Sequence, residues 1–538
     1  MDFRLLLAVA ATALLDVPAS TPPSPLATAM KAGMCGPGEG SSAASSAKPA
    51  VIVPGLTPAH MPASRIAEAQ AFFDQGLGQL FGFDYAEALK SFRRASVLDP
   101  ACAMCGWGEA LALGPYINSG PIDAGTIAKA RLLTGRVLAN TGLSERDRAL
   151  AEAVHARHEP GGKQSGVHGD RYADTMVRLA ARWPDDDLVS ILAAEAIMDS
   201  QPWDYWQADG KMPKGRAGES IRLVETVLAR SPDNPQAIHL LIHLTEASAN
   251  PGRAAVGAAK LGQIAPAAPH MVHMPSHTWY RIGRFDESIA ANKAAIVADE
   301  AYAKAVGDDP KFYGYFTHHA HFLASSATQI GDRATALAAA DALEAAIPVA
   351  AALKKPYLQA RLVTALHARS RFLTPAEVLA LPAPDARLGR VLIAWHGVRA
   401  EALAITGDTT AARAELDKLR RQRDAVAAQA ATRPGGARSA GSGMTIAAIA
   451  DGVARGRIAE AEGEFDEALR QYRAAEAIEG NLGYFEPPLW PTPVAVLSGQ
   501  LRLKRGDSAG AAVDFRRALA QRPKNSLASN GLAATKRA

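Results

Sequence analysis

Two histidine pairs, separated by one constant interval, constrain this chain more than any other feature. His239 and His243 are four residues apart, as are His273 and His277, and the second pair follows the first by 34 residues. Residues four apart lie on one face of an α-helix. An interval of 34 residues is the period of a helix–turn–helix repeat that stacks in one direction. The spacing therefore predicts adjacent repeats that present the same histidine pair in the same orientation.

Other stretches have the composition of the same kind of repeat. Residues 72–100 place Ala88, Phe92, Ala95 and Pro100 at the small, aromatic, small and proline positions that close a tetratricopeptide unit. The alanines allow two helices to approach closely, the phenylalanine fills the remaining gap, and the proline ends the second helix. No stretch of useful length alternates with a period of two, which argues against a sheet.

The length of the chain favours an array over one compact body. A chain of 538 residues is too long for a single hydrophobic core, whereas a repeat array grows in one dimension. We therefore predict an all-α fold over residues 59–538. It is a tetratricopeptide-like α-solenoid, a right-handed superhelix of helix pairs.

The N-terminal residues have the composition of a secretory signal. Residues 1–19 combine Arg4 with an apolar run over residues 5–15 that is too short to span a bilayer, followed by small residues. Residues 20–58 are rich in Pro, Ser, Ala and Gly, which predicts a disordered linker. We expect an exported, periplasmic or secreted protein. No later stretch is apolar for long enough to cross a membrane, so we expect no span in the mature chain.

The charge pattern argues against nucleic acid as a partner. Charged residues make up 21% of the chain and the net charge is +4, with acidic and basic residues mixed throughout. A nucleic-acid surface needs a basic stripe or patch, and none stands out in the sequence. The expected partners are a metal ion, a small molecule or another protein.

Six motifs together resemble one group of repeat proteins. They are FDYAEALKSF, LDPACAMCGWGEALALGPYIN, MDSQPWDYW, HLLIHLTEAS, HMVHMPSHTWYRIGRF and YFEPPLWPTPVAVLSGQL. With them the chain resembles a family of bacterial exported tetratricopeptide-repeat proteins over most of residues 70–530. The resemblance implies architecture more than chemistry. Two positions depart from the family, because Tyr85 stands where a histidine is frequent and THHAHF rearranges a histidine cluster.

The resemblance also implies which side chains face a ligand. In the wider tetratricopeptide family, fixed positions of each first helix line a concave groove where ligands bind. Matching this sequence to that register implies that its unusual side chains point into the groove, namely Cys102, Cys105, Glu109, His239, His243, Glu246, His270, His273, His277, His318 and His321.

Clustered histidines in a groove favour a transition-metal site. Neutral imidazole is a common metal ligand, and pairs on adjacent helices can converge on one ion. Met271 and Met274 add soft sulfur nearby, which favours copper over zinc. We expect a central cluster of His239, His243, His273 and His277. The full set of predicted metal ligands is His239, His243, His270, His273, His277, His318, His321, Cys102 and Cys105.

Several functions remain open on this sequence. The first is an exported protein that binds a transition metal or small ligand in the histidine-lined groove. The second is a metal-dependent enzyme in which Glu109 or Glu246 is the catalytic acid or base. The third is a scaffold that binds a protein partner. A fourth interpretation gives the histidines no ligand, only hydrogen bonds to carbonyls and to one another.

The Cys102 and Cys105 pair also has more than one interpretation. Gly106 occupies the place where covalent haem attachment needs a histidine. What remains is a local disulfide, which an exported chain favours, a pair of metal-binding thiolates, or two small buried residues. Trp203, Trp206 and the EPPLWPTP segment are predicted to serve packing and turns.

Overall fold

The computed structural model describes residues 48–164, 166–309, 315–432 and 441–537. Within these ranges the regular structure is helical, and the two β-bridges, Gln164–Val167 and Trp206–Pro213, are isolated. The prediction of an all-α solenoid of helix pairs is therefore confirmed, while its right-handed sense stays a prediction. The predicted signal peptide, residues 1–19, lies outside the described ranges.

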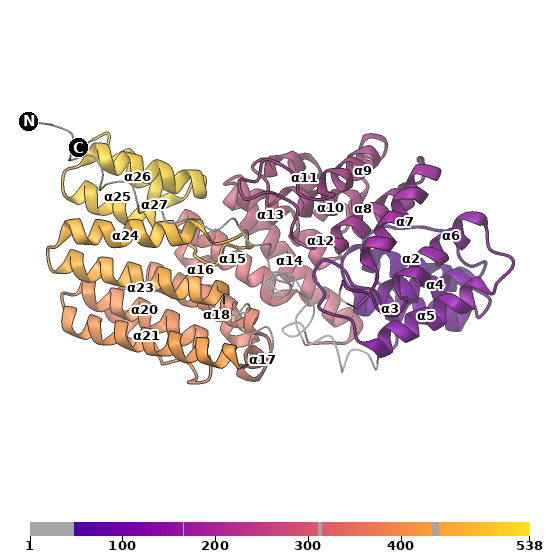
Figure 1. The fold of residues 1–538 in the computed structure, drawn as a ribbon, viewed down its shortest axis with the longest axis horizontal. Coiled ribbons are helices and arrows are strands. Elements are labelled where there is room, and N and C mark those ends of the chain that lie inside the picture. The colour runs from indigo at the N-terminus through magenta and orange to yellow at the C-terminus, as the bar shows by residue number, and fades with distance from the viewer. Residues whose placement is uncertain (1–47, 165, 310–314, 433–440, 538) are drawn as a thin grey trace, which may run out of the picture.

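The helices follow one another along an elongated array (Figure 1). The first part holds α2 (Ala67–Phe81), α3 (Tyr85–Leu98), α4 (Ala103–Ala112), α5 (Ala124–Leu138), α6 (Glu145–Arg157), α7 (Gly169–Arg182), α8 (Asp187–Ser200) and α9 (Ala217–Arg230). The middle part holds α10 (Pro235–Thr245), η3 (Pro251–Ala254), α11 (Ala255–Ile264), α12 (Pro269–His273), α13 (Pro275–Arg281), α14 (Phe285–Val306) and α15 (Phe316–Ile330).

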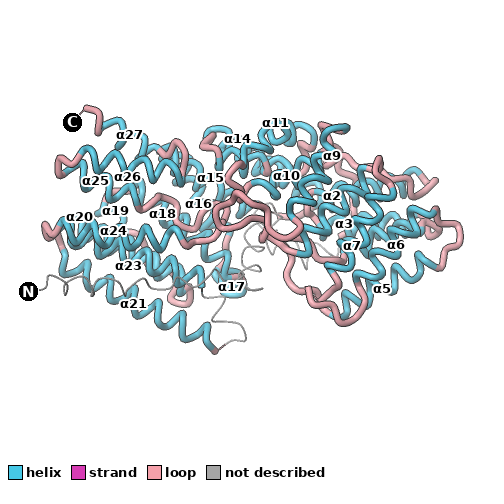
Figure 2. The backbone as a smooth tube through the Cα atoms, turned by 45° about the horizontal axis from the view of Figure 1, so that its top comes forward, coloured by secondary structure: helices cyan, strands magenta, loops and turns pink. Residues whose placement is uncertain are grey.

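The last part of the array continues in the same way to the C-terminus (Figure 2). It holds α16 (Arg333–Ala346), α17 (Val349–Lys354), α18 (Pro356–Phe372), α19 (Pro375–Ala380), α20 (Gly389–Ile405), α21 (Thr409–Ala431), α23 (Gly441–Ala461), α24 (Phe465–Gly480), α25 (Ala495–Lys504), α26 (Ser508–Gln521) and α27 (Ser526–Ala534). Helices that are neighbours in sequence, such as α20 and α21 or α23 and α24, pack against each other.

A recurring Gly–Asp pair makes the turns between paired helices. Gly331 has a φ of 83°, a left-handed conformation that a glycine adopts without steric cost and that ends α15. The side chain of Asp332 then accepts a hydrogen bond from the Thr335 N–H and caps α16. The same pair recurs at Gly407–Asp408 and Gly506–Asp507. Each pair thus ends one helix and begins the next.

Aromatic rings packed on glycines hold neighbouring helices together. A Cβ atom on Gly76 would lie 2.8 Å from the Phe92 ring, and one on Gly108 would lie 2.5 Å from it. Only glycine therefore fits at both places. The Phe515 ring has the same relation to Gly499, where a Cβ would lie 2.7 Å away. The packing role that the sequence assigns to Phe92 is confirmed.

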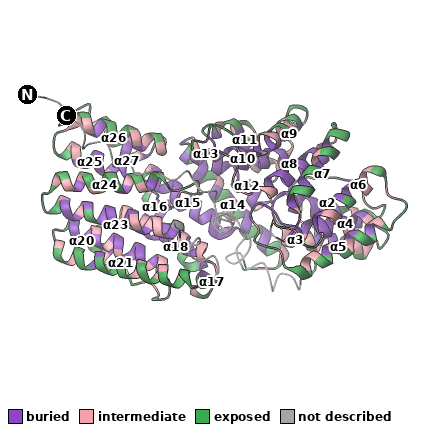
Figure 3. Ribbon diagram, viewed as in Figure 1, coloured by how far each residue is buried: buried purple, intermediate pink, exposed green. Residues whose placement is uncertain are grey.

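The helices that carry the histidines are buried on every side. Every residue of α10 is buried, and only Ile330 of α15 is not (Figure 3). Pro275 divides the second histidine helix into α12 and α13, because a proline inside a helix lacks the N–H that the ladder needs. This middle part is therefore an enclosed core and not the wall of an open groove.

The segment 48–58, assigned from the sequence to a disordered linker, has a defined path along the array. The Val53 N–H donates to Gln75 Oε1 at 2.8 Å, and the Gly55 carbonyl accepts from the Ala267 N–H at 2.9 Å. The ordered chain therefore begins before residue 58. In the part of the chain that the structure describes, no helix combines the length and apolarity that a membrane crossing requires.

Loss of one of these rings should loosen the end of the array. We expect Phe515→Ala to lower the free energy of unfolding by about 3–5 kcal/mol, because the ring is fully buried and leaves a cavity. Val513→Ala, on an exposed side chain of the same helix, should change it by less than about 0.5 kcal/mol. Urea unfolding of the two variants measures the difference, and equal losses would contradict this packing role.

Candidate metal centre

The predicted open groove is wrong, because all eight clustered histidines are buried. Their exposed fractions are between 0% and 2%. The Phe83 ring, from the turn between α2 and α3, lies 4.4 Å from the His239 ring and 5.6 Å from the His243 ring, measured between ring centroids. Tyr315 stacks on His270 at 4.3 Å. Side chains from distant parts of the chain therefore fill the space where a ligand groove was expected.

A first group consists of His239, His243 and His270. One ring nitrogen from each of these residues lies within 4.8 Å of the other two. His239 Nδ1 lies 2.8 Å from the Phe81 carbonyl oxygen, which can only accept. Nδ1 therefore carries the hydrogen, and Nε2 presents its lone pair 3.2 Å from His270 Nε2. We call these three residues the first triad.

His243 is oriented in the same way within the first triad. Its Nδ1 lies 2.9 Å from Glu246 Oε1, so the carboxyl group accepts the Nδ1 hydrogen. Its Nε2 is buried and has no hydrogen-bond partner. A carboxylate or carbonyl that fixes one ring nitrogen leaves the other free as a ligand, which is the usual arrangement around protein-bound metals.

A second triad, His273, His277 and His318, lies beside the first. His273 Nδ1 lies 2.7 Å from Asn292 Oδ1, and the Asn292 amide nitrogen donates to the Ser288 carbonyl. The amide oxygen is therefore an acceptor, and His273 Nδ1 carries the hydrogen. His318 contacts both other rings, and neither of its nitrogens has a hydrogen-bond partner.

Two ring nitrogens approach each other closely in the second triad. His277 Nδ1 lies 2.6 Å from Glu246 Oε2, and Glu486 contacts the same nitrogen. His277 Nε2 lies 2.7 Å from His273 Nε2, whose lone pair faces it because the His273 hydrogen is on Nδ1. A hydrogen on His277 Nε2, or a cation bound between the two atoms, would each account for this approach.

Glu246 connects the two triads and belongs to a buried carboxyl pair. Its two oxygens contact His243 and His277, and the Tyr484 hydroxyl donates to Oε2 at 3.2 Å. Glu486 contacts the same His277 nitrogen, Nδ1. Burial raises the pKa of Glu246 to about 8, and burial together with the neighbouring Glu246 raises the pKa of Glu486 well above its usual range. The pair therefore retains a proton at neutral pH.

Burial also keeps five of the triad imidazoles neutral. It lowers the pKa of His239, His243 and His270 well below 6.5, and neighbouring imidazoles add to the effect. The pKa values of His273 and His318 are lowered for the same reasons. Neutral imidazole is the form that binds metal ions.

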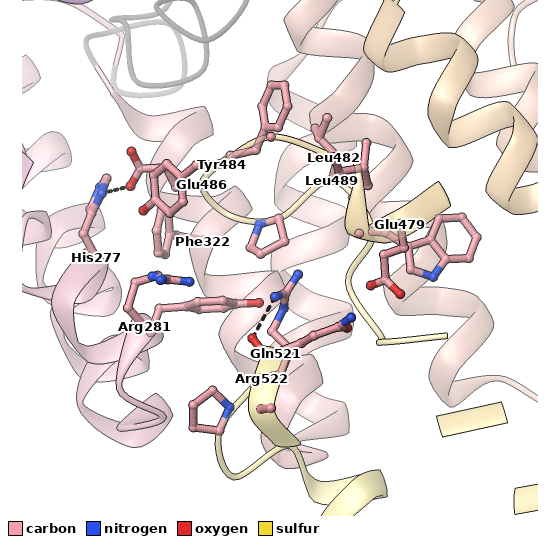
Figure 4. A pocket seen from close by; sticks show the side chains of 18 of the residues that line it. His277, Arg281, Phe322, Glu479, Leu482, Tyr484, Glu486, Leu489, Gln521 and Arg522 are labelled. Carbon is pink, nitrogen blue, oxygen red and sulfur yellow. Dashed lines mark hydrogen bonds and ion pairs between the residues drawn. The ribbon is translucent and has the colours of Figure 1, made fainter. Parts of the chain in front are cut away.

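One cavity lies beside each triad. A cavity of about 380 Å³ is lined by His277, Glu486 and Tyr484 (Figure 4). A smaller one, of about 30 Å³, is lined by His270 and Tyr315. Each triad thus has one member beside a cavity.

The four histidines expected at the centre are in contact but divide between the triads. His270 and His318, which were predicted as ligands outside that central cluster, complete the two sets. The assignment of His321 as a ligand is not supported, because its Nε2 lies 2.8 Å from Thr364 Oγ1 on α18. His319, which the sequence reasoning omitted, packs on His273 instead.

Three further predicted site residues lie outside the triads. Cys102 and Cys105 form a disulfide with Cα atoms 5.4 Å apart, so neither sulfur is a free ligand. Cys102 precedes α4 and does not lie within it. Glu109 forms ion pairs with Arg93 and Lys129, at 2.7 and 3.0 Å, and takes no part in either triad.

Sequence reasoning missed the residues that orient the histidines. His319 Nδ1 lies 2.6 Å from Asp299 Oδ2, and Asn292 orients His273, yet both orienting residues lie on the long helix α14 without any motif. Glu486 was assigned to packing within the EPPLWPTP segment. The one sequence signal for its role at the site was that Glu486 precedes two prolines in one of the six motifs of the family resemblance.

The helix pairs and the enclosed histidines define the class of protein: an all-α, tetratricopeptide-like solenoid with a buried histidine cluster. The chain matches no protein-family model and no curated protein. Three solved structures align with most of it at TM-scores between 0.26 and 0.32. Similarity at that level carries no conclusion about binding or activity.

The three aligned structures are themselves different proteins. Cut9 in the APC/C hetero-tetramer Cut9–Hcn1 is 10% identical, covering 90% of this chain and 79% of its own. A human IFIT1 dimer with m7Gppp-AAAA is 13% identical, covering 85% and 90%. Yeast Tom70 is 11% identical, covering 87% and 96%.

Adjacent histidines of α15 should respond to substitution with opposite signs in chelator-treated protein. His318→Leu removes a buried imidazole without hydrogen bonds and should raise the free energy of unfolding by about 1–3 kcal/mol. His319→Leu leaves the buried Asp299 carboxyl group without its hydrogen-bond donor and should lower the free energy of unfolding by about 3–5 kcal/mol.

The advantage of His318→Leu should widen as the pH falls from 7 to 5. In the folded wild type the pKa of His318 lies well below 6.5, so on acidification His318 binds a proton in the unfolded state only. This proton uptake lowers the free energy of unfolding of the wild type by about 1.4 kcal/mol per pH unit, and the leucine variant does not suffer this loss. Urea unfolding at several pH values measures both effects. A destabilised His318→Leu variant would contradict the assignment of an unpartnered ring.

Proposed function

We propose that this chain binds transition-metal ions at the two triads, one ion at each. The observation that carries the proposal is the 2.7 Å approach of the His273 and His277 Nε2 atoms, which lie with His318 in one buried set of three imidazoles. The first triad supports it independently, with His239 Nε2 and His270 Nε2 3.2 Å apart. The sites are prepared for an ion because carbonyl, amide and carboxyl groups already orient the rings.

Three imidazoles suit an ion that prefers nitrogen ligands and leave a coordination position open. The sulfur atoms that favoured copper give no support, because Met271 and Met274 pack within the main apolar core. The proposal therefore covers zinc and copper alike. An open position beside the Glu246–Glu486 pair also suits a metal-dependent enzyme, in which Glu246 keeps the role of acid or base expected for it.

We place this protein outside the cytoplasm, either in the periplasm or among secreted proteins. The signal-like residues 1–19 support this location. The Cys102–Cys105 disulfide is consistent with an oxidising compartment.

A second candidate function is a scaffold for a protein partner. The fold favours it, because arrays of helix pairs present extended surfaces for binding. The two candidates differ in what they need from the histidines. A scaffold has no use for two buried sets of neutral imidazoles, so metal content decides between them.

Substitutions in one triad should remove the metal ion of that triad only. Untagged protein loaded with Zn²⁺ and freed of excess should hold two ions per chain. His239→Ala and His277→Ala should each lose one ion, and the double variant should lose both. His321→Ala and His396→Ala, outside the triads, should keep two. Mass spectrometry of metals measures the stoichiometry. Wild-type protein that holds no Zn²⁺ would leave the scaffold as the better function.

Metal affinity should change little in mildly acidic solution. In the His277→Ala variant, which isolates the first triad, we expect the Zn²⁺ dissociation constant to rise by less than about tenfold between pH 7.5 and 5.5. Protons compete weakly there because burial lowers the pKa of His239, His243 and His270. Three imidazoles of ordinary pKa would lose about 1,000-fold at pH 5.5. Competition with a chromophoric chelator measures the constant, and the larger loss would contradict burial of the triad.

A further inference from the structure

The cavity beside the second triad has the lining of a small-ligand site. Its volume of about 380 Å³ falls within the range of about 300–1,000 Å³ typical of such sites. It lies where α13 and α15 meet the connection between α24 and α25 and the end of α26 (Figure 4). Aromatic and apolar side chains form part of its wall, including Phe322, Leu482, Leu489 and Trp490.

Two guanidinium groups in this lining donate to backbone carbonyl groups. Arg281 donates from Nε to the Glu246 carbonyl at 2.7 Å and from Nη2 to the Ser248 carbonyl at 3.0 Å. Arg522 donates from Nη1 to the Gln521 carbonyl, and its buried Nε has no hydrogen-bond partner. Burial raises the pKa values of Glu246 and Glu479 to about 8 and about 7, although Arg281 lowers the first and Arg522 lowers the second. Neither carboxyl group is therefore fully ionised near pH 7, and both guanidinium groups keep the capacity to bind an anion.

The same lining contains a carboxyl group with an unused oxygen. Glu479 is 7% exposed, and its Oε2 accepts from the Val494 N–H at 2.9 Å. Its Oε1 is buried without a hydrogen-bond partner. Burial raises the pKa of Glu479 to about 7 although the Arg522 guanidinium group lowers it, and a ligand cation would lower it further. In Figure 4, Arg522 lies between Arg281 and Glu479.

We infer that this cavity binds a free α-amino acid with an apolar side chain. The ligand carboxylate would lie against Arg281 and Arg522, its ammonium group against Glu479 Oε1, and its side chain against the aromatic wall. Positive and negative groups in one small cavity complement a zwitterion better than they complement a simple anion. The inference goes beyond metal binding and depends on the cavity alone.

The test uses L-phenylalanine as probe, titrated into the full-length protein by calorimetry at pH 8. N-acetyl-L-phenylalanine lacks the ammonium charge, and L-phenylalaninamide lacks the carboxylate. Each should bind about 10–100-fold more weakly than L-phenylalanine, because each leaves a charged protein group without its partner. Equal binding of the parent and either derivative would overturn the inference, as would no binding of L-phenylalanine.

Variants of Arg522 and Glu479 test which protein charges bind the ligand. Arg522→Gln and Glu479→Gln should each weaken L-phenylalanine binding by about tenfold or more. Arg517→Gln, on the helix α26 that ends just before Arg522, changes an arginine paired with Glu476 and should bind as wild type does. Thermal unfolding of each variant checks the fold. Wild-type affinity in folded Arg522→Gln or Glu479→Gln would overturn the assignment.

The same titration separates this inference from the proposed function. Chelator-treated protein should bind L-phenylalanine as well as Zn²⁺-loaded protein does, because no triad nitrogen holds the ligand in this scheme. Binding by a protein that takes up no Zn²⁺ would overturn metal binding and support the amino-acid site. Zn²⁺ uptake without amino-acid binding would support metal binding and overturn the amino-acid site.

Discussion

The middle of this molecule depends on the two carboxyl oxygens of Glu246. One contacts His243 on α10 and the other His277 on α13, so a single side chain joins two successive repeats. A fully buried carboxyl group costs free energy unless its oxygens are hydrogen-bonded. Here Tyr484 supplies a further donor from the connection after α24. Removing this group would leave two buried imidazoles without the partner that orients them.

The histidines are enclosed because segments from both ends of the array cover them. Phe83 and the Phe81 carbonyl approach from the turn after α2, and Tyr484 and Glu486 approach from the connection before α25. A tetratricopeptide array normally leaves its concave face open for a ligand. In this chain that face is closed by the chain itself, which turns a candidate groove into a candidate metal centre with a cavity beside each triad.

The sequence predicted the elements of the fold better than the surroundings of its site. Local signals sufficed for the helices, since Phe92 and Pro275 act through neighbours in the chain or in the next helix. The same is true of the histidine pairs, because a fixed period places equivalent residues side by side. Enclosure could not be predicted in this way, because it depends on contacts between residues more than 150 positions apart, such as His239 with Phe81.

The long-range contacts change how a repeat array should fold. In an ordinary solenoid each repeat touches only its neighbours, so the ends can unfold while the middle persists. Here the Tyr484–Glu246 hydrogen bond spans 238 residues and the Tyr315–Phe83 hydrogen bond spans 232. The two ends are thereby tied to the centre, and closing such long loops carries an entropic cost before any contact is gained. We therefore expect the first and middle parts of this array to unfold more cooperatively than the repeats of an ordinary solenoid do.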